Sequence, residues 1–456
     1  MHKIFLISIV TVALGCERTL SSDVDQVAAV GAATDPLSTS VVYWDGEPRI
    51  SDDGQKVIFL SGKCADVSCS VSGRTAYLWT ISGSDTARVP LLAVANRLHG
   101  DVEAEISPDG NWAAVIQSNS SHKPQIILRS MASETDLAIS AAAMQLSEGS
   151  AIRNISFTSD SAFLVWEAED ASGVSTVFGH AASTSLNPVK ISGGSAETKP
   201  MVGKSGSTYY QVSVGSASKV YVRSGSSLSA LASSAVSTIN LDGFILSSGG
   251  KVIGSDFYYV SAVDYPNKAR IPYGDGEAES QGLVYLTSEI RKVDLTGPTE
   301  TPADGSSNED TAKADTSDNY NKQTDILSLS GVGQSSSGYL TLGREYYHCL
   351  SVEFSSLIMT LYDGTKTRIL PKYENDQASV ISSVCDSVAN ATAVPGADSP
   401  YDFSIRDARI TKVGSDYKVV WSTPQTAKGD YEIFYGSFSS DLSSMSRNSV
   451  SENYPE

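Results

Sequence analysis

Carboxylates and histidines are the side chains of this sequence whose types could support catalysis. Glu167, Glu169 and Asp170 lie close together, at the end of the apolar run that contains Trp166. Two carboxylates can cleave a glycosidic bond when one donates a proton and the other serves as base or nucleophile. Because both groups must converge on the sugar, this chemistry depends on the fold that positions them. A polysaccharide-acting hydrolase or lyase is therefore one hypothesis for the function.

Other catalytic signatures are weak or missing in the sequence. It contains no G-x-S-x-G nucleophile elbow, the turn that presents the serine of many hydrolases. His99 and His122 stand in the turn-like contexts RLHGD and SSHKP, which are typical of solvated histidines. No two cysteines have the C-x-x-C spacing of a structural zinc site. We therefore expect no metal, no cofactor and no catalytic residue, and we favour a binding function.

The charge balance narrows the classes of partner. The 456 residues include 33 Lys and Arg against 52 Asp and Glu, which gives a formal net charge of -19. Proteins that bind nucleic acid usually present a basic surface to the phosphates, so a nucleic-acid partner is not expected. Hydrophobic residues make up 41% of the chain, which is enough to build a packed core.

The N-terminus has the pattern of an export signal. Lys3 precedes an unbroken stretch of apolar and small residues from Ile4 to Leu14. This stretch is too short to span a bilayer core of about 30 Å and is typical of a signal-peptide h-region. The residues Ala13-Leu14-Gly15-Cys16 resemble the lipobox of bacterial lipoproteins. In that family the cysteine thiol is acylated and the peptide before it is removed.

The lipobox resemblance implies that residues 1–15 are a signal peptide and that Cys16 anchors the mature protein to a membrane. Several acyl chains make such an anchor durable. Glu17 takes the place where an aspartate often retains lipoproteins at the inner membrane, so we expect the outer membrane. Ordinary secretion with an unmodified Cys16 is the alternative. Residues 16–39 are small and polar and are expected to form a tether.

The remaining cysteines suit an oxidising compartment. If Cys16 is acylated, four cysteines remain, and this even number predicts two disulfides. We favour a pairing of Cys64 with Cys69 across a local loop and of Cys349 with Cys385 across a longer one.

The chain after the tether is built of short strand-like runs separated by Gly, Ser, Asp and Asn. Three stretches share a short strand, a Ser/Thr-x-Asp turn and a strongly apolar strand, and they cover residues 48–62, 104–118 and 155–169. A period of roughly fifty residues that holds several strands is the signature of a β-propeller. The apolar strand after each turn is expected to be sandwiched between neighbouring blades.

We therefore predict an all-β fold: a single β-propeller over residues 40–440 with about seven four-stranded blades, six or eight being possible. In the weaker fourth copy, Leu228–Ser233 is expected to be the last strand. The final copy lacks a clear fourth strand. We expect the N-terminal strand near residue 40 to complete that blade and so remove an exposed sheet edge, with residues 441–456 as a polar tail.

The turns resemble the WD40-like repeat of TolB-like propellers. The resemblance rests on the S-x-D-G turns of the first two copies and on a partial third copy in which Ser161 replaces the glycine. It implies a propeller fold and a structural, turn-forming role for Ser51, Asp53, Gly54, Ser107, Asp109, Gly110 and Asp160. The role of the Tol-system protein is not implied, because that protein has an added α/β domain and no lipid anchor.

Residues 296–325 contain no large aliphatic side chain and are rich in acidic residues. We interpret them as a disordered loop inserted between the fifth and sixth copies. Alternatively, Asp310, Asp315 and Asp318 could provide oxygen ligands for calcium, although their spacing is not that of an EF-hand.

The leading hypothesis is a membrane-anchored, non-catalytic lipoprotein. Its propeller would bind a protein or glycan component of the cell envelope on the face where loops of all blades converge.

Overall fold

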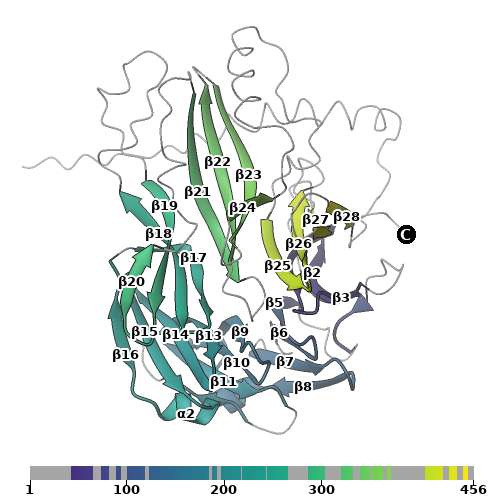
Figure 1. Cartoon of the computed structure of the whole chain (residues 1–456). Helices are drawn as coiled ribbons and strands as arrows, with labels where there is room; N and C mark the ends of the chain where they lie inside the picture. Colours follow the sequence, from purple (N-terminus) through teal and green to yellow (C-terminus); the bar gives the residue numbers. More distant parts are fainter. Residues whose placement is uncertain are drawn as a thin grey trace, which may run out of the picture.

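In the computed structural model, antiparallel β-sheets stand around a common axis, so the chain is a single all-β propeller (Figure 1). The structure describes residues 43–64, 73–81, 89–93, 100–118, 123–183, 187–192, 197–216, 218–242, 244–264, 286–302, 320–331, 339–349, 352–362, 367–370, 406–424, 431–438 and 445–449. The expected signal peptide, the tether with Cys16 and the calcium candidates Asp310, Asp315 and Asp318 lie outside these residues.

The strands follow one another as antiparallel neighbours, four to a unit. The first unit contains β1 (Tyr43–Ile50), β2 (Lys56–Lys63), β3 (Thr75–Thr80) and β4 (Val89–Pro90). The second contains β5 (Asp101–Ile106), β6 (Trp112–Ser118), β7 (Pro124–Ser130) and β8 (Thr135–Ile139), followed by the 3₁₀ turn η2 (Ala141–Met144). The third contains β9 (Ala151–Phe157), β10 (Phe163–Glu169), β11 (Ser175–Ala181) and β12 (Val189–Lys190).

The later units repeat this order. The fourth contains β13 (Thr198–Ser205), β14 (Thr208–Ser216), β15 (Lys219–Gly225), the helix α2 (Leu228–Ser233) and β16 (Ser237–Asn240). The fifth contains β17 (Phe244–Ile253), β18 (Asp256–Asp264), β19 (Leu286–Asp294) and β20 (Thr299–Pro302). The sixth contains β21 (Tyr320–Gly331), β22 (Tyr339–Cys349), β23 (Val352–Tyr362) and β24 (Thr367–Leu370). The last contains β25 (Arg406–Val413), β26 (Asp416–Pro424), β27 (Tyr431–Phe438) and β28 (Met445–Ser449).

These strands form six hydrogen-bonded sheets, five with four strands and one with eight. The eight-stranded sheet consists of the first and last units, which one parallel bridge joins at Trp44 and Tyr431. Counted as sheets the propeller has six blades, and counted as four-stranded units it has seven. Both numbers lie within the range that the sequence predicts.

We predicted that the N-terminal strand completes the last blade, and this prediction is wrong apart from the single bridge between Trp44 and Tyr431. β1 pairs along its length with β2 and is the first strand of its own unit, while β28 supplies the fourth strand of the last unit. β28 lies within residues 441–456, which we expected to be a polar tail. Beyond the pairing at Trp44, Figure 1 shows the purple and yellow ends of the chain side by side.

The core lies between neighbouring sheets. The second strand of each early unit is buried on both faces, as in β10, where every residue from Phe163 to Ala168 is buried. One cluster of buried side chains joins the second and third units around Trp166, which is fully buried. Another joins the first and last units through Phe59 and Tyr435. This burial confirms that the apolar strand after each turn is sandwiched.

Two local expectations are wrong. Leu228–Ser233 forms the helix α2 and not a strand, because Ser227 caps it by accepting a hydrogen bond from Ala230 N (3.2 Å) and Leu and Ala favour a helix. The acidic segment 296–325 is structured at both ends, where β20 and β21 begin at Thr299 and Tyr320.

No helix among the described residues is long and apolar enough to cross a membrane.

Because β28 pairs with β27, we predict that the C-terminal residues contribute to the stability of the propeller and that residues 1–39 do not. Deleting residues 440–456 should lower the free energy of unfolding by roughly 2–4 kcal/mol, because ladder hydrogen bonds that each contribute about 1 kcal/mol are lost. Deleting residues 1–39 instead should leave it unchanged. Chemical denaturation of both truncated proteins measures this, and an unchanged free energy of unfolding after deletion of residues 440–456 would contradict the role of β28 in the last unit.

Candidate functional site at the propeller axis

The first predicted turn joins β1 to β2 by hydrogen bonds of its own side chains. Ser51 Oγ donates to Asp53 Oδ1 (2.5 Å) and accepts from Lys56 N (3.1 Å). Gly54 has a φ of 67°, a conformation that glycine adopts without steric cost. The residues Ser51, Asp53 and Gly54 therefore lie in a tight hairpin, and Ser51 is fully buried.

The second and third turns follow the same plan. Ser107 Oγ donates to Asp109 Oδ1 (2.6 Å) and Gly110 again has a φ of 67°. In the third turn Ser161 holds this left-handed conformation, with a φ of 59°. Thr158 takes the serine's place there and accepts hydrogen bonds from the main chain through its Oγ1.

The turns also bind one another across neighbouring units. Asp52 N donates to the Pro108 carbonyl (2.7 Å), and Asp109 N donates to Ser161 Oγ (3.0 Å). Thr411 Oγ1 of the last unit donates to the Asp52 carbonyl (2.8 Å). These bonds connect the last, first, second and third units in order.

Asp160 extends this chain of contacts to the fourth unit. Its Oδ2 accepts hydrogen bonds from Lys204 Nζ (2.6 Å) and from the Tyr209 hydroxyl (2.6 Å). Partial burial opposes the charge of Asp160, but the bonds from Lys204 and Tyr209 outweigh it and lower its pKa to about 2.

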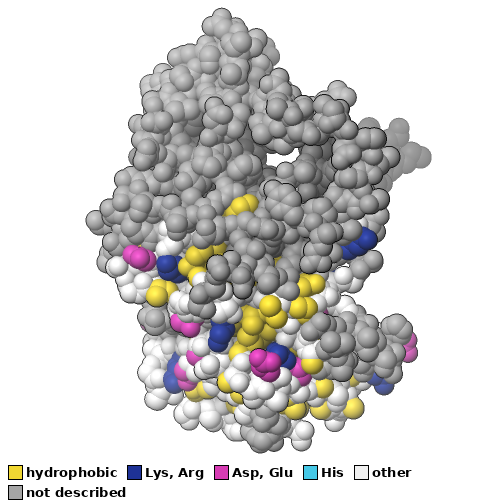
Figure 2. Space-filling model, turned by 90° about the vertical axis from the view of Figure 1, so that its right-hand side faces the viewer, with side chains coloured by type: hydrophobic (Ala, Val, Ile, Leu, Met, Phe, Trp, Pro, Cys, Tyr) yellow, Lys and Arg dark blue, Asp and Glu magenta, His cyan; other side chains and the backbone are white. Residues whose placement is uncertain are grey.

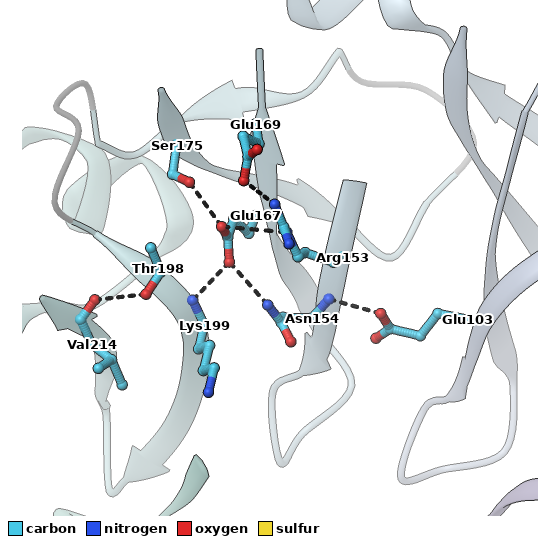
Figure 3. A network of polar contacts seen from close by, with 9 residues as sticks. All are labelled: Glu103, Arg153, Asn154, Glu167, Glu169, Ser175, Thr198, Lys199 and Val214. Atoms are coloured by element: carbon cyan, nitrogen blue, oxygen red, sulfur yellow. Dashed lines mark hydrogen bonds and ion pairs between the residues drawn. The ribbon is translucent and has the colours of Figure 1, made fainter. Parts of the chain in front are cut away.

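Glu167 is the centre of a network that joins the third and fourth units (Figure 3). Its carboxylate accepts hydrogen bonds from Lys199 N of β13 (2.9 Å), Asn154 Nδ2 of β9 (2.9 Å) and Ser175 Oγ of β11 (2.8 Å). The side chain is 3% exposed. Glu167 therefore stabilises the position of β13 against its own sheet.

Glu103 joins the second and third units in a similar way. One oxygen accepts a hydrogen bond from Asn154 N of β9 (2.7 Å; Figure 3), and the other accepts one from Ile155 N (2.7 Å). Burial raises the pKa of Glu103 above its ordinary value, although these bonds oppose the shift.

The three carboxylates that suggested a glycosidase all form contacts with neighbouring residues. Glu167 is saturated as described, and Glu169 forms an ion pair with Arg153. Asp170 Oδ1 accepts hydrogen bonds from Ser172 N (2.8 Å) and Val174 N (3.0 Å) within a turn. Each of these three carboxylates thus has a partner within the third unit.

Charged side chains from four units meet at the axis. The first strands of consecutive units contact one another around the ring. Arg49 Nε of β1 donates to Glu105 Oε2 of β5 (2.9 Å). Lys251 of β17 and Arg409 of β25 interact electrostatically with both residues and with each other. We name Arg49, Glu105, Lys251 and Arg409 the axial cluster.

The electrostatics of the axial cluster are dominated by burial and by positive charge. Burial, and then the neighbouring Arg49, lower the pKa of Arg409 to about 10. Burial also lowers the pKa of Lys251, with Arg409 and Arg49 adding to the effect and Glu105 opposing it. For Arg49, burial is outweighed by the carboxylates of Glu105 and Glu47, so its pKa is raised.

Two of these cations have few partners within the described part of the chain. The Arg409 guanidinium donates one hydrogen bond, to the Ala408 carbonyl (2.9 Å). Lys251 is a half-buried residue and forms no hydrogen bond or ion pair to a described residue. A partly desolvated guanidinium and ammonium with open donor positions can bind an anionic group.

Sequence reasoning missed the axial cluster, although the repeats contain a signal for it. Arg49 and Glu105 stand two residues before the Ser that begins the turn, in RIS and EIS, and Arg409 stands in the similar run RIT within β25. A charged residue at the same place in three first strands becomes meaningful once those strands are known to line an axis.

The structure describes only two of the five cysteines named in the sequence analysis. Cys64 follows β2 and Cys349 ends β22, whereas Cys16, Cys69 and Cys385 are not described. Acylation and disulfide pairing remain predictions. Within the described ranges, no group of three or more His, Cys, Asp or Glu is arranged to hold a metal ion.

Comparisons with known proteins give similarities of structure only. No protein-family model and no curated protein matches the chain. The β-propeller domain of the Trilobed protease from Pyrococcus furiosus is similar, with a TM-score of 0.49 and 10% identity over 90% of this chain and 99% of that one. A putative TolB from Agrobacterium tumefaciens gives 0.34 and 16% over 57% and 79%.

Whole peptidases are also similar to the chain. The apo form of prolyl oligopeptidase B from Galerina marginata gives a TM-score of 0.49 at 12% identity, covering 95% of this chain. This chain spans about half of that protein's length, at 53%.

The Asp160 contacts predict an acid-dependent loss of stability. Because the pKa of Asp160 is about 2 against an ordinary 3.8, its stabilising effect is complete above pH 4 and disappears as the pH falls towards 2. Asp160→Asn should cost about 1 kcal/mol at neutral pH, a value reduced for solvent screening. The difference from wild type should shrink steadily as the pH falls from 4 to 2 in urea unfolding. A difference that stays unchanged down to pH 2 would contradict the ion pair.

The Glu167 network predicts a larger effect for a buried carboxylate than for an exposed one. Glu167→Gln should lower the free energy of unfolding by about 2–3 kcal/mol, because an amide N–H₂ would face main-chain and side-chain donors. The matched variant Glu169→Gln should change it by less than about 1 kcal/mol. Equal costs in denaturant unfolding would mean that Glu167 does not join the units.

Proposed function

We propose that the protein is a lipid-anchored, extracytoplasmic binding protein of the cell envelope and that its partner binds at the propeller axis. The anchor part of the proposal rests on the lipobox-like residues that end in Cys16. The export signal, the acidic composition and the even number of remaining cysteines support the same compartment.

The observation that carries the binding part is the axial cluster. Arg49, Glu105, Lys251 and Arg409 come from four different units, so only the closed ring brings them together. Among the described residues neither Lys251 nor Arg409 forms an ion pair, and keeping such charges partly desolvated costs stability. Such a cost at the axis is typical of a binding site, where function and stability compete.

A non-catalytic role is supported by the structural contacts that the nearby carboxylates form. Glu103, Glu167 and Glu169 are used to hold neighbouring strands, as their hydrogen bonds and ion pairs indicate. Among the described residues these contacts favour a binding role, and the polysaccharide-acting enzyme stays the alternative hypothesis.

The proposal is tested first by the location of the full chain in cells. Replacing Cys16 by Ala should abolish incorporation of an alkyne fatty acid and move the protein from the membrane fraction to the soluble one, because the anchor is lost. Fractionation with click labelling measures both. Equal membrane association of wild type and Cys16→Ala would overturn the anchor.

The same experiment has a second arm for binding. Full-length wild type and the variants Arg409→Glu and Lys292→Glu are immobilised and exposed to solubilised envelope fractions, and retained components are identified by mass spectrometry. A component retained by wild type and Lys292→Glu but lost from Arg409→Glu is the expected result, because Lys292 lies in β19 and outside the axial cluster. Retention that is indifferent to Arg409 would place the partner elsewhere.

A further inference from the structure

We propose that the interface between the third and fourth units binds one internal water molecule, which bridges Glu197, Gln211 and Arg223. The site includes no residue of the axial cluster, so its test is independent of the proposed function.

The three side chains meet on the face of the fourth unit that packs against the third. Tyr209 of β14 belongs to the buried cluster that joins these two units, and Gln211, two residues further on, points to the same face of the sheet. Gln211 and Arg223 are register partners on β14 and β15, so their side chains are neighbours there. Glu197, just before β13, reaches the same place, because its Oε1 accepts a hydrogen bond from Arg223 Nη2 (2.8 Å).

All three side chains are withdrawn from bulk solvent. Gln211 is fully buried, and the side chains of Glu197 and Arg223 are each 10% exposed. On the face shown in Figure 2, by contrast, acidic and basic side chains of the described residues are interspersed at the surface, where solvent can hydrate them. A polar atom in the buried interface must find its partner inside the molecule, or its desolvation costs stability.

Each of the three side chains keeps one buried polar atom that forms no hydrogen bond to the protein: Glu197 Oε2, Gln211 Oε1 and Arg223 Nε. Neighbouring atoms of the same groups are already used, since Gln211 Nε2 donates to Ser213 Oγ (2.5 Å) and Arg223 Nη1 donates to the Ser234 carbonyl (3.2 Å). The remaining set consists of two acceptors and one donor. A water molecule matches this set, because it can donate twice and accept once, and buried waters typically form about three hydrogen bonds.

Ions match the same set less well. An anion could accept a hydrogen bond from Arg223 Nε, but it would face the carboxylate of Glu197 and the carbonyl oxygen of Gln211. A metal cation could bind these two oxygens, but the guanidinium of Arg223 would repel it. A neutral molecule that both donates and accepts avoids both conflicts.

Another buried glutamine shows the same amide satisfied by side chains alone. Gln117 of β6 is 1% exposed. Its Nε2 donates to Asp101 Oδ1 (3.0 Å), and its Oε1 accepts a hydrogen bond from Gln125 Nε2 (3.0 Å). Both polar atoms of that amide have protein partners, whereas the carbonyl oxygen of Gln211 has none. The protein therefore can complete such a group with its own side chains, and at Gln211 it does not.

The test is a crystal structure of the full-length protein at a resolution that shows ordered water. Wild type should show one water within hydrogen-bond distance of Glu197 Oε2, Gln211 Oε1 and Arg223 Nε. Gln211→Met keeps the length of the side chain but removes the amide, so this water should disappear or lose occupancy. The matched variant Gln55→Met removes an exposed amide and should leave the water in place.

Magnetic relaxation dispersion of ¹⁷O in water provides the same test in solution, because it detects internal waters with long residence times. Its amplitude should fall by the contribution of one water in Gln211→Met and stay unchanged in Gln55→Met. The wild-type structure decides the inference even if Gln211→Met does not fold.

Three results would overturn the inference. A direct hydrogen bond from Arg223 Nε to Gln211 Oε1, with no water beside it, would show that the protein satisfies its own atoms. An anomalous signal at the site would replace the water by an ion. Equal dispersion amplitudes for wild type and Gln211→Met would mean that no long-lived water depends on this amide.

Discussion

The stability of the propeller depends on hydrogen-bond partners for the main-chain groups of its innermost strands. Each first strand except β1 pairs with one neighbour, and a register shift interrupts its ladder with the second strand. Donors freed in this way are costly when buried. Carboxylates of an adjoining unit accept them: Glu103 binds Asn154 N and Ile155 N, and Glu167 binds Lys199 N. The contacts that close the ring are thus the same contacts that satisfy its inner wall.

This constraint explains which charges remain at the axis. Carboxylates near the inner wall are used as acceptors, so Glu103 and Glu167 contribute to structure before they can contribute to chemistry. Basic side chains cannot satisfy main-chain N–H groups. Among the described residues, Lys251 of β17 and Arg409 of β25 therefore keep open donors, which an anionic group can use.

The sequence predicted what local chemistry determines. The Ser-x-Asp-Gly turns and the apolar strands after them follow from turn geometry and burial, and they indicated the propeller. Closure was mispredicted, because only the pairing partners of β1 and β28, which the assembled ring sets, tell which unit each strand completes. Leu228–Ser233 was mispredicted since a capping serine decides between helix and strand in so short a segment. The axial cluster was missed because its members meet only after the ring has closed.

Backbone strain points to the same inner wall. Glu47, Asn154, Lys199 and Asp407 all have positive φ angles, between 46° and 59°, and all stand at the register shift of a first strand. Only glycine adopts this conformation without a cost of about 1 kcal/mol. The side chains offset part of it, as when Asn154 Nδ2 binds Glu167 and Glu47 pairs with Arg74. Asp407 brings its charge beside Arg409 and Arg49 instead. The strained position in β25 therefore adds one negative charge beside the two arginines of the axial cluster.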